Sequence, residues 1–236
     1  MNGPIKPSSG LSDYLNNECV TLLTSLTPAV GAICYELDQD DKPKHCQLHD
    51  IQPEFHQAYE KKFHQYDPLL PQYFRHQHHR SIVSIGTILA TNELHKSTFC
   101  HQYLYPAGYQ DLIDLHFRHK GKLVAGLTLF FNQRVALENK SKLAKFQAIH
   151  QFIEASIEKL PSLRKQDRFQ TFSSHHKLTQ KESKVFGLII KGMSNQAIAD
   201  TLYCSLATIK THLQNIFNKL GLNSKTEVIS LYLQTH

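Results

Sequence analysis

The chain of 236 residues contains no tryptophan, two methionines and five cysteines. No two cysteines form a Cys-x-x-Cys pair and their number is odd, which favours reduced core thiols over a disulfide framework. No apolar run approaches the length of about 18 residues that a membrane span needs, and the N-terminus lacks a signal-peptide core. We therefore expect a cytoplasmic protein that does not enter a membrane.

Signatures of catalysis and of metal binding are also missing. The sequence has no nucleophile elbow, phosphate-binding loop or paired-carboxylate arrangement, so we expect neither an enzyme nor a cofactor. Two histidine groups stand out, His76-Gln77-His78-His79 and His116-x-x-His119. No cysteine or carboxylate completes either group, and a spacing of three on a strand places side chains on opposite faces. Surface histidines are therefore expected, and no metal site.

Positive charge is concentrated at the C-terminal end of the chain. The composition is 41% hydrophobic and 19% charged, which is typical of a globular protein, and the formal net charge is +6. Residues 175–236 contain seven lysines, no arginine and three acidic residues, a net charge of +4. This distribution favours a polyanionic partner for the tail.

Capping signals predict four short helices in this tail. Thr179 and Glu182 stand three residues apart, as do Ser224 and Glu227, and both pairs fit a capping box. Gly192 fits the left-handed stop that follows a helix. The predicted helices cover Gln180–Lys191, Asn195–Tyr203, Leu206–Leu220 and Lys225–Gln234.

The third of these helices has an apolar side and a polar side. On a wheel of about 100° per residue, one stripe is formed by Ile209, Leu213, Ile216 and Leu220. The opposite side is small or hydrogen-bonding and can approach base edges in the major groove. The candidate DNA-contacting residues are Lys210, Thr211, Gln214, Thr208, His212, Ser205 and Asn195. The alternative is a helical bundle with a solvated polar face.

The tail resembles the LuxR/FixJ-type helix-turn-helix of bacterial transcription factors. The matching residues are Leu178, Thr179, Glu182, Gly192, Ser194, Asn195, Ile198, Ala199, Leu202, Ser205, Thr208, Lys210, His212, Asn215, Ile216, Lys219, Leu220, Ser224 and Glu227. The resemblance implies binding to double-stranded DNA, with contacts from Lys210, Thr211 and Gln214 and phosphate contacts near Thr208 and His212. Relatives often have a basic residue where Gln214 stands, which leaves the base preference open.

The first 160 residues predict an α+β sensor domain with a mixed sheet flanked by helices, similar to PAS/GAF-like or autoinducer-binding domains. The predicted strands are Val30–Leu37, His45–Ile51, Ser81–Ile85, Tyr109–Arg118 and Lys122–Phe131. The longest helical pattern covers Val135–Leu160. The expected organisation is a sensor domain over 1–160, a mobile linker over 161–176 and a helix-turn-helix domain over 177–236.

One segment of the sensor domain resembles the ligand pocket of acyl-homoserine-lactone receptors. It reads Phe55-x-x-x-Tyr59, followed by Tyr66-Asp67-Pro68. The resemblance implies that Tyr59 and Asp67 line a pocket, with Phe55 and Tyr66 as further candidates. The tryptophan of those receptors is replaced by Phe55, which has no N–H to donate to a lactone. We therefore expect an apolar or amphipathic small molecule more than a lactone.

The sequence therefore predicts a DNA-binding transcriptional regulator whose N-terminal domain senses a small ligand, dimerises, or does both. The resemblance implies a homodimer, formed through the last helix near Val228, Ile229 and Tyr232; the Val135–Leu160 helix is another candidate interface. RNA polymerase is a further candidate partner. The alternative is a ligand-independent regulator whose N-terminal domain binds a protein partner.

Overall fold

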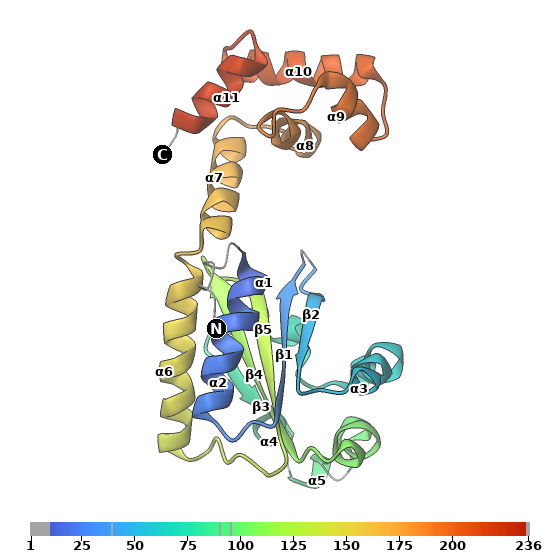
Figure 1. Ribbon diagram of the computed structural model, residues 1–236, viewed down its shortest axis with the longest axis vertical. Coiled ribbons are helices and arrows are strands. Elements are labelled where there is room, and N and C mark those ends of the chain that lie inside the picture. The colour runs from blue at the N-terminus through green and yellow to red at the C-terminus, as the bar shows by residue number, and fades with distance from the viewer. Residues whose placement is uncertain (1–9, 39, 90, 95, 235–236) are drawn as a thin grey trace, which may run out of the picture. The chain divides into compact units, whose positions relative to one another are not determined.

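The computed structural model describes all residues except 1–9, 39, 90, 95 and 235–236. The chain divides into two compact units, residues 1–162 and 163–236. Over the described residues, the first unit contains five strands together with helices, and the second contains helices only (Figure 1). The predicted class, an α+β domain followed by an all-α domain, is confirmed. No helix among the described residues is long and apolar enough to cross a membrane.

Five strands form one sheet in the order β2-β1-β5-β4-β3. The strands are β1 (Gly31–Leu37), β2 (Pro43–His49), β3 (Ile82–Ser84), β4 (Asp111–His119) and β5 (Lys122–Phe131). The predicted strands are therefore present, but their pairing is antiparallel throughout and not mixed. A tight turn is the reason for the pairing of β4 with β5: Lys120 and Gly121 have φ angles of 50° and 77°, as a two-residue turn requires.

Helices cover one face of this sheet (Figure 1). They are α1 (Leu11–Tyr14), the π-helical turn η1 (Leu15–Cys19), α2 (Val20–Leu26) and α6 (Lys140–Ile157). Their apolar stripes, including Leu15, Leu23 and Ile153, are fully buried. Helix α6 begins later than the pattern predicted because Asn139 caps it: its side-chain oxygen accepts hydrogen bonds from the amides of Ser141 and Lys142.

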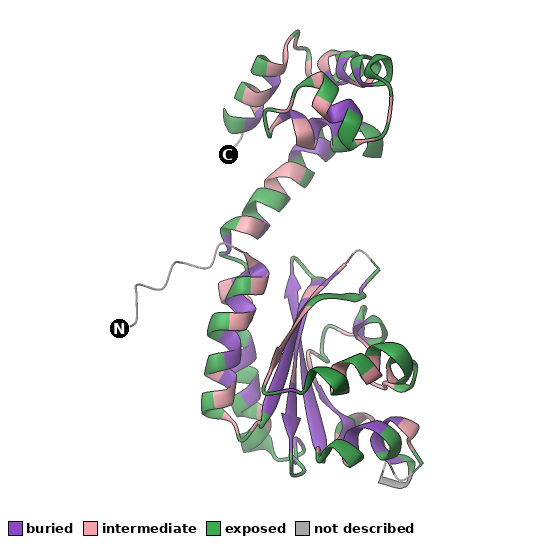
Figure 2. Ribbon diagram, turned by 45° about the vertical axis from the view of Figure 1, so that its right-hand side comes forward, coloured by how far each residue is buried: buried purple, intermediate pink, exposed green. Residues whose placement is uncertain are grey.

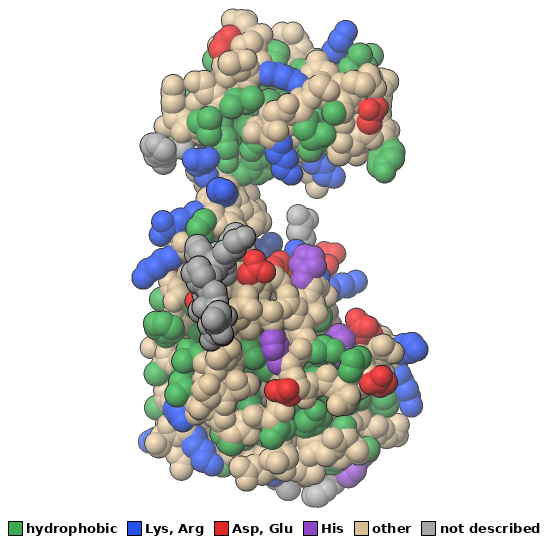
Figure 3. Space-filling model, viewed as in Figure 1, with side chains coloured by type: hydrophobic (Ala, Val, Ile, Leu, Met, Phe, Trp, Pro, Cys, Tyr) green, Lys and Arg blue, Asp and Glu red, His purple; other side chains and the backbone are tan. Residues whose placement is uncertain are grey.

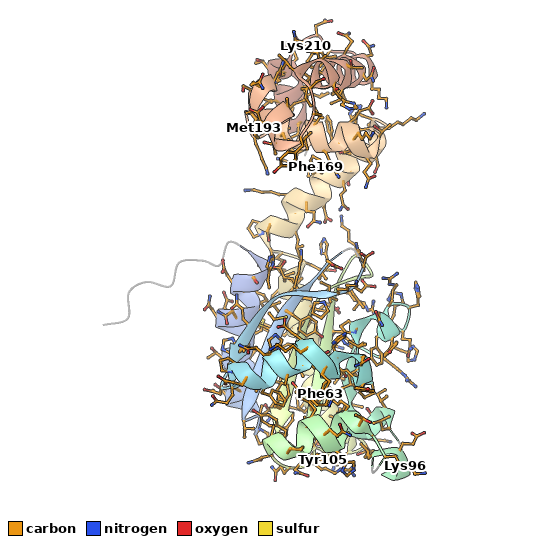
Figure 4. The ribbon with its side chains drawn as sticks, turned by 90° about the vertical axis from the view of Figure 1, so that its right-hand side faces the viewer. Phe63, Lys96, Tyr105, Phe169, Met193 and Lys210 are labelled. Atoms are coloured by element: carbon orange, nitrogen blue, oxygen red, sulfur yellow. The ribbon has the colours of Figure 1, made fainter. Side chains whose placement is uncertain are left out.

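Short helical segments lie over the opposite face. They are α3 (Pro53–Ala58), η2 (Tyr59–Phe63), η3 (His64–Tyr66), η4 (Pro71–Phe74), α4 (Ile85–Ile88), α5 (Thr91–Leu94), η5 (Cys100–Leu104) and η6 (Tyr105–Ala107). Figure 4 shows the α3–η2 segment and the η5–η6 segment side by side, with Phe63 between them. The rings of Phe63 and Tyr103 stack with centroids 5.0 Å apart, and those of Phe55 and Tyr103 at 4.1 Å. This layer is therefore held together by aromatic packing, and it covers a sheet whose strands β4 and β5 are mostly buried, whereas β2 is partly exposed (Figure 2).

The second unit contains the four predicted helices at almost their predicted limits. They are α8 (Gln180–Ile189), α9 (Asn195–Thr201), α10 (Leu206–Leu220) and α11 (Lys225–Gln234). The capping box is present: Thr179 Oγ1 accepts from the Glu182 amide at 3.3 Å, and Glu182 accepts from the Thr179 amide at 2.8 Å. The Glu182 carboxylate also accepts a hydrogen bond from Lys219 Nζ at 2.6 Å.

The segment expected to be a mobile linker is a helix, α7 (Pro161–His175). Its C-terminal half belongs to the core of the second unit, where the rings of Phe169 and Phe172 stack on Phe186 with centroids 5.3 and 4.9 Å apart. Phe172 is buried. Two phenylalanines three residues apart lie on one side of a helix, but the polar residues around them hid this pattern in the sequence.

Candidate functional site

Helix α10 presents the predicted polar side to solvent. Ile209, Leu213 and Ile216 are buried in the core of the unit, which confirms the apolar stripe. Lys210, Thr211 and Gln214 are exposed (Figure 4 labels Lys210). An exposed polar side supported by a buried stripe is the arrangement that a groove-reading helix needs.

Local hydrogen bonds fix the side chains on this surface. Ser205 caps α10: its Oγ accepts from the Thr208 amide at 3.1 Å and lies 2.9 Å from Thr208 Oγ1. Thr211 Oγ1 donates to the Ala207 carbonyl at 3.1 Å, and Gln214 Nε2 donates to the Asn218 side chain at 3.0 Å.

The other two predicted DNA-contacting residues are less exposed. His212 on α10 and Asn195 at the start of α9 are both partly buried. The structure therefore groups Ser205, Thr208 and the exposed residues of α10 on one surface, which we call the α10 face. His212 and Asn195 lie at positions of lower exposure.

Lysines give the second unit its positive surface (Figure 3). Lys219 donates to Glu182 and to the Lys177 carbonyl, and Lys225 Nζ donates to the Met193 carbonyl at 2.8 Å. Lys210 is exposed on α10. Two of the seven lysines in residues 175–236 therefore donate hydrogen bonds within this unit.

The residues implied as a dimer surface on the last helix are mostly in the core. Val228 is fully buried and Tyr232 is 5% exposed. The Tyr232 ring packs edge-on against Phe172 and Phe186 at centroid distances of 5.4 Å. The structure does not test the expected dimer, but it places these two side chains in the core of the unit, with Tyr232 against Phe172 of α7. Ile229 is partly buried.

The N-terminal unit contains a cavity of about 60 Å³ between the sheet and the layer of short helices. It is lined by Ile33, Tyr35, Pro43, Cys46, His56, Tyr59, Asp67, Leu69, Pro71, Phe99, Tyr103, Leu112, Asp114, Thr128 and Phe130. A surface depression of about 360 Å³ shares several of these residues, among them His56, Tyr59 and Pro71. The cavity therefore adjoins a wider hollow at the surface.

Two of the four predicted ligand residues line this cavity. Tyr59 Oη donates a hydrogen bond to Asp67 Oδ2 at 2.8 Å, and the Leu69 amide donates to Asp67 Oδ1 at 2.8 Å. Phe55 does not line it but supports it by stacking on Tyr103. Tyr66 is 45% exposed and lies outside the lining.

Sequence reasoning missed a second polar group in the cavity. Asp114 on β4 accepts hydrogen bonds from Thr128 Oγ1 at 2.8 Å and from Tyr35 Oη at 3.1 and 3.2 Å. These residues lie on three neighbouring strands, and only the strand order brings them together. Gly126 makes room for this group: a Cβ there would stand 2.2 Å from the Tyr35 ring.

Burial changes the acidity of the groups around the cavity. Burial raises the pKa of Asp67 to about 6, although the hydrogen bonds from Leu69 and Tyr59 act in the opposite direction. Burial also raises the pKa of Tyr59, and the neighbouring Asp67 carboxylate raises it further. The Tyr59 hydroxyl therefore stays protonated and acts as a hydrogen-bond donor.

His116 is a buried residue and not the surface histidine that the sequence suggested. Its side chain is completely enclosed, its Nε2 lies 3.2 Å from Asp114 Oδ2, and its ring packs on Phe74 with centroids 5.0 Å apart. His119 is buried as well, at 9% exposure. The cause is that both faces of β4 are covered, which strand periodicity alone did not reveal.

Comparison with known proteins agrees with the helix-turn-helix interpretation. Residues 176–232 match the family model of bacterial regulatory proteins, luxR family. The monoamine regulon transcriptional regulator of Klebsiella aerogenes is 30% identical over 219 residues, which cover 93% of this chain and 90% of that protein. The transcriptional regulatory protein YdfI of Bacillus subtilis (strain 168) is 40% identical over 68 residues, covering 29% of this chain and 32% of that protein.

Among solved structures, Escherichia coli SdiA aligns over 96% of this chain and 91% of its own, with a TM-score of 0.46 and 13% identity. The family assignment rests on the relative from Klebsiella, because its similarity extends over both units. The chain belongs to the LuxR family of bacterial transcriptional regulators.

Proposed function

We propose that this regulator binds specific sites on double-stranded DNA as a homodimer and responds to a small ligand held in the cavity of its N-terminal domain. The α10 face carries the DNA-binding half of the proposal: exposed hydrogen-bonding side chains and Lys210 stand on a helix whose other side is buried. The cavity, with its two carboxyl groups and its aromatic walls, supports the ligand-binding half.

In the proposed mechanism, α10 enters the major groove. Ser205 and Thr208, at the helix start, meet the phosphates, while Lys210, Thr211 and Gln214 meet base edges. Two copies read half-sites about one helical turn apart. A ligand changes the balance between competent and incompetent forms only if it binds one form better. RNA polymerase contact is part of the same proposal, since a bound regulator acts on transcription.

Selection of DNA from a random duplex pool by the full-length chain, at near-physiological salt, tests the DNA half. An enriched inverted repeat is expected, and Lys210→Ala should bind that repeat weakly. Ser12→Ala, far from α10 in the chain, is a matched control that should bind normally. An enriched sequence without symmetry would refute the homodimer, and no enrichment would refute sequence-specific binding.

The relative from Klebsiella aerogenes is named for a monoamine regulon. We propose genes of monoamine use as the first promoters to test with the selected DNA site. Reporter expression from such a promoter that depends on this chain would support the assignment. Expression that is the same with and without the chain would refute it for that promoter.

A further inference from the structure

The chemistry of the cavity indicates the charge of its ligand. This inference rests on the proposal that the cavity binds a small molecule. Two carboxyl groups, those of Asp67 and Asp114, face the same space, and the charge of Asp114 raises the electrostatic cost of ionising Asp67. Among the described residues that line it there is no lysine or arginine, and the one histidine, His56, has its Nε2 3.7 Å from the Glu60 carboxylate. Two buried carboxylates without a cation are costly, so the space favours a positive charge.

His116 pairs with Asp114 from outside the lining of the cavity. Its Nε2 is 3.2 Å from Asp114 Oδ2, so the ring donates one hydrogen bond to the carboxylate. Its Nδ1 is buried and has no hydrogen-bond partner among the described residues.

Arg118 is the nearest strongly basic residue along β4, and it is engaged elsewhere. Its guanidinium donates to the carbonyls of Phe74, Arg75 and Gly121. These carbonyls hold the guanidinium away from the cavity, whose lining does not include Arg118. The carboxyl pair therefore remains available for a cation from outside.

The two carboxyl groups differ in the hydrogen bonds they can still accept. Asp114 accepts from Thr128, Tyr35 and His116, which occupies most of its acceptor sites. Asp67 accepts one bond on each oxygen, from Tyr59 and from the Leu69 amide, and keeps a free lone pair on each. Asp67 can therefore bind N–H donors directly, while Asp114 contributes its negative charge.

The walls suit a cation with an apolar body. The rings of Tyr59 and Phe99 lie 5.9 and 5.2 Å from that of Tyr103, measured between centroids, and all three line the cavity. Aromatic faces attract cations and cover apolar groups. A volume of about 60 Å³ accepts a few non-hydrogen atoms, because one water needs ≈ 10–15 Å³ on the same measure. A larger body has to extend toward the neighbouring depression.

We infer that the ligand is a small primary amine in its ammonium form, with its N–H groups on Asp67, its charge balanced by Asp67 and Asp114, and its apolar body against the tyrosines. Repulsion from the carboxyl pair excludes an anionic ligand. The ammonium group supplies three donors and no acceptor, which matches the free lone pairs of Asp67.

Isothermal titration of the full chain with three probes of similar shape tests this inference. The probes are 2-phenylethylamine, 2-phenylethanol and phenylacetate at pH 7.5. The amine is expected to bind about 10- to 100-fold more tightly than the alcohol, because hydrogen bonds to a charged group are the stronger ones, and phenylacetate should not bind. The comparison between probes uses the unaltered protein and does not depend on the folding of a variant.

Variants of the two cavity carboxyl groups then test whether they balance the charge of the bound amine. Asp67→Asn and Asp114→Asn should each reduce the ratio of amine to alcohol affinity about tenfold or more, whereas a merely structural role would weaken both probes alike. Asp111→Asn is the matched control: Asp111 is also buried on β4, burial raises its pKa to about 6, and it does not line the cavity. The Asp111→Asn variant should keep the wild-type ratio of amine to alcohol affinity.

Three results would overturn the inference. Equal binding of amine and alcohol would leave a ligand-binding cavity without charge selection, so the proposed function would stand. An unchanged affinity ratio in both cavity variants would place the amine elsewhere. Failure of the amine to bind at millimolar concentration would refute the ligand class. The DNA selection would still test the proposed DNA binding, because it does not depend on a ligand.

Discussion

Replacing Asp67 by asparagine should stabilise the ligand-free N-terminal domain at neutral pH. The folded state raises the pKa of Asp67 from 3.8 to about 6, chiefly because the carboxyl group is buried. An acid whose pKa is raised on folding binds protons more strongly in the native state. The contribution of Asp67 to the stability of the wild-type domain is therefore fully present below pH 3.8 and is lost as pH rises through 6.

The size of the effect follows from the shift. About 2 pKa units at 1.36 kcal/mol each give about 3 kcal/mol above pH 7, and about 2 kcal/mol of this develops between pH 4.5 and 7.5. The figure is an upper value, because the residue as a whole is only partly buried and solvent screens part of the cost. Asparagine is neutral and keeps the shape of the side chain, so the variant should lack this pH dependence.

Native-state hydrogen exchange measures the effect in each domain separately. The free energy of opening at amides of β4 and β5 is compared between Asp67→Asn and wild type from pH 4.5 to 7.5, with amides of α10 as an internal standard. Any fixed cost of asparagine cancels in this comparison. Asp13→Asn, which removes an exposed carboxyl group, is the control. If the difference between variant and wild type does not change with pH, Asp67 does not carry a buried charge at neutral pH.

Three further predictions concern the helices and the sheet. Lys210→Ala should cost about 1–3 kcal/mol of DNA-binding free energy in a gel-shift titration and leave the melting temperature unchanged, because the side chain is exposed; lost stability would contradict this. Phe172→Ala should destabilise the C-terminal domain by about 3–5 kcal/mol in urea unfolding, since its ring packs on Phe186; a loss below about 1 kcal/mol would mean that α7 is not part of that core. Gly126→Ala should displace the Tyr35 ring and lower the melting temperature, because the new Cβ would overlap the ring. If neither the melting temperature nor the affinity for 2-phenylethylamine changed, the described packing of Tyr35 on Gly126 would be refuted.

The sequence predicted most where the determinants are local. A capping box joins residues three apart, and a helix stripe repeats every three or four residues, so α8 to α11 and the buried side of α10 could be read before any folding was known. The amides of Glu182 and Glu227 donate to the hydroxyl groups of Thr179 and Ser224, which confirms these two caps. The strands were predicted for the same reason, since alternation is a local pattern.

Only the tertiary structure decided which residues meet. One cavity is shared by four residues from separate parts of the chain, Tyr35, Asp67, Asp114 and Thr128. They meet because the strands are ordered β2-β1-β5-β4-β3 and a layer of short helices covers the sheet. The same covering buries His116, which no local pattern indicates. In physical terms, a side chain's type sets what it can donate, accept or bury, but burial and partners depend on which distant segments pack against it. The sequence thus determined the helices of the DNA-binding domain, and the packing of the sheet determined the cavity.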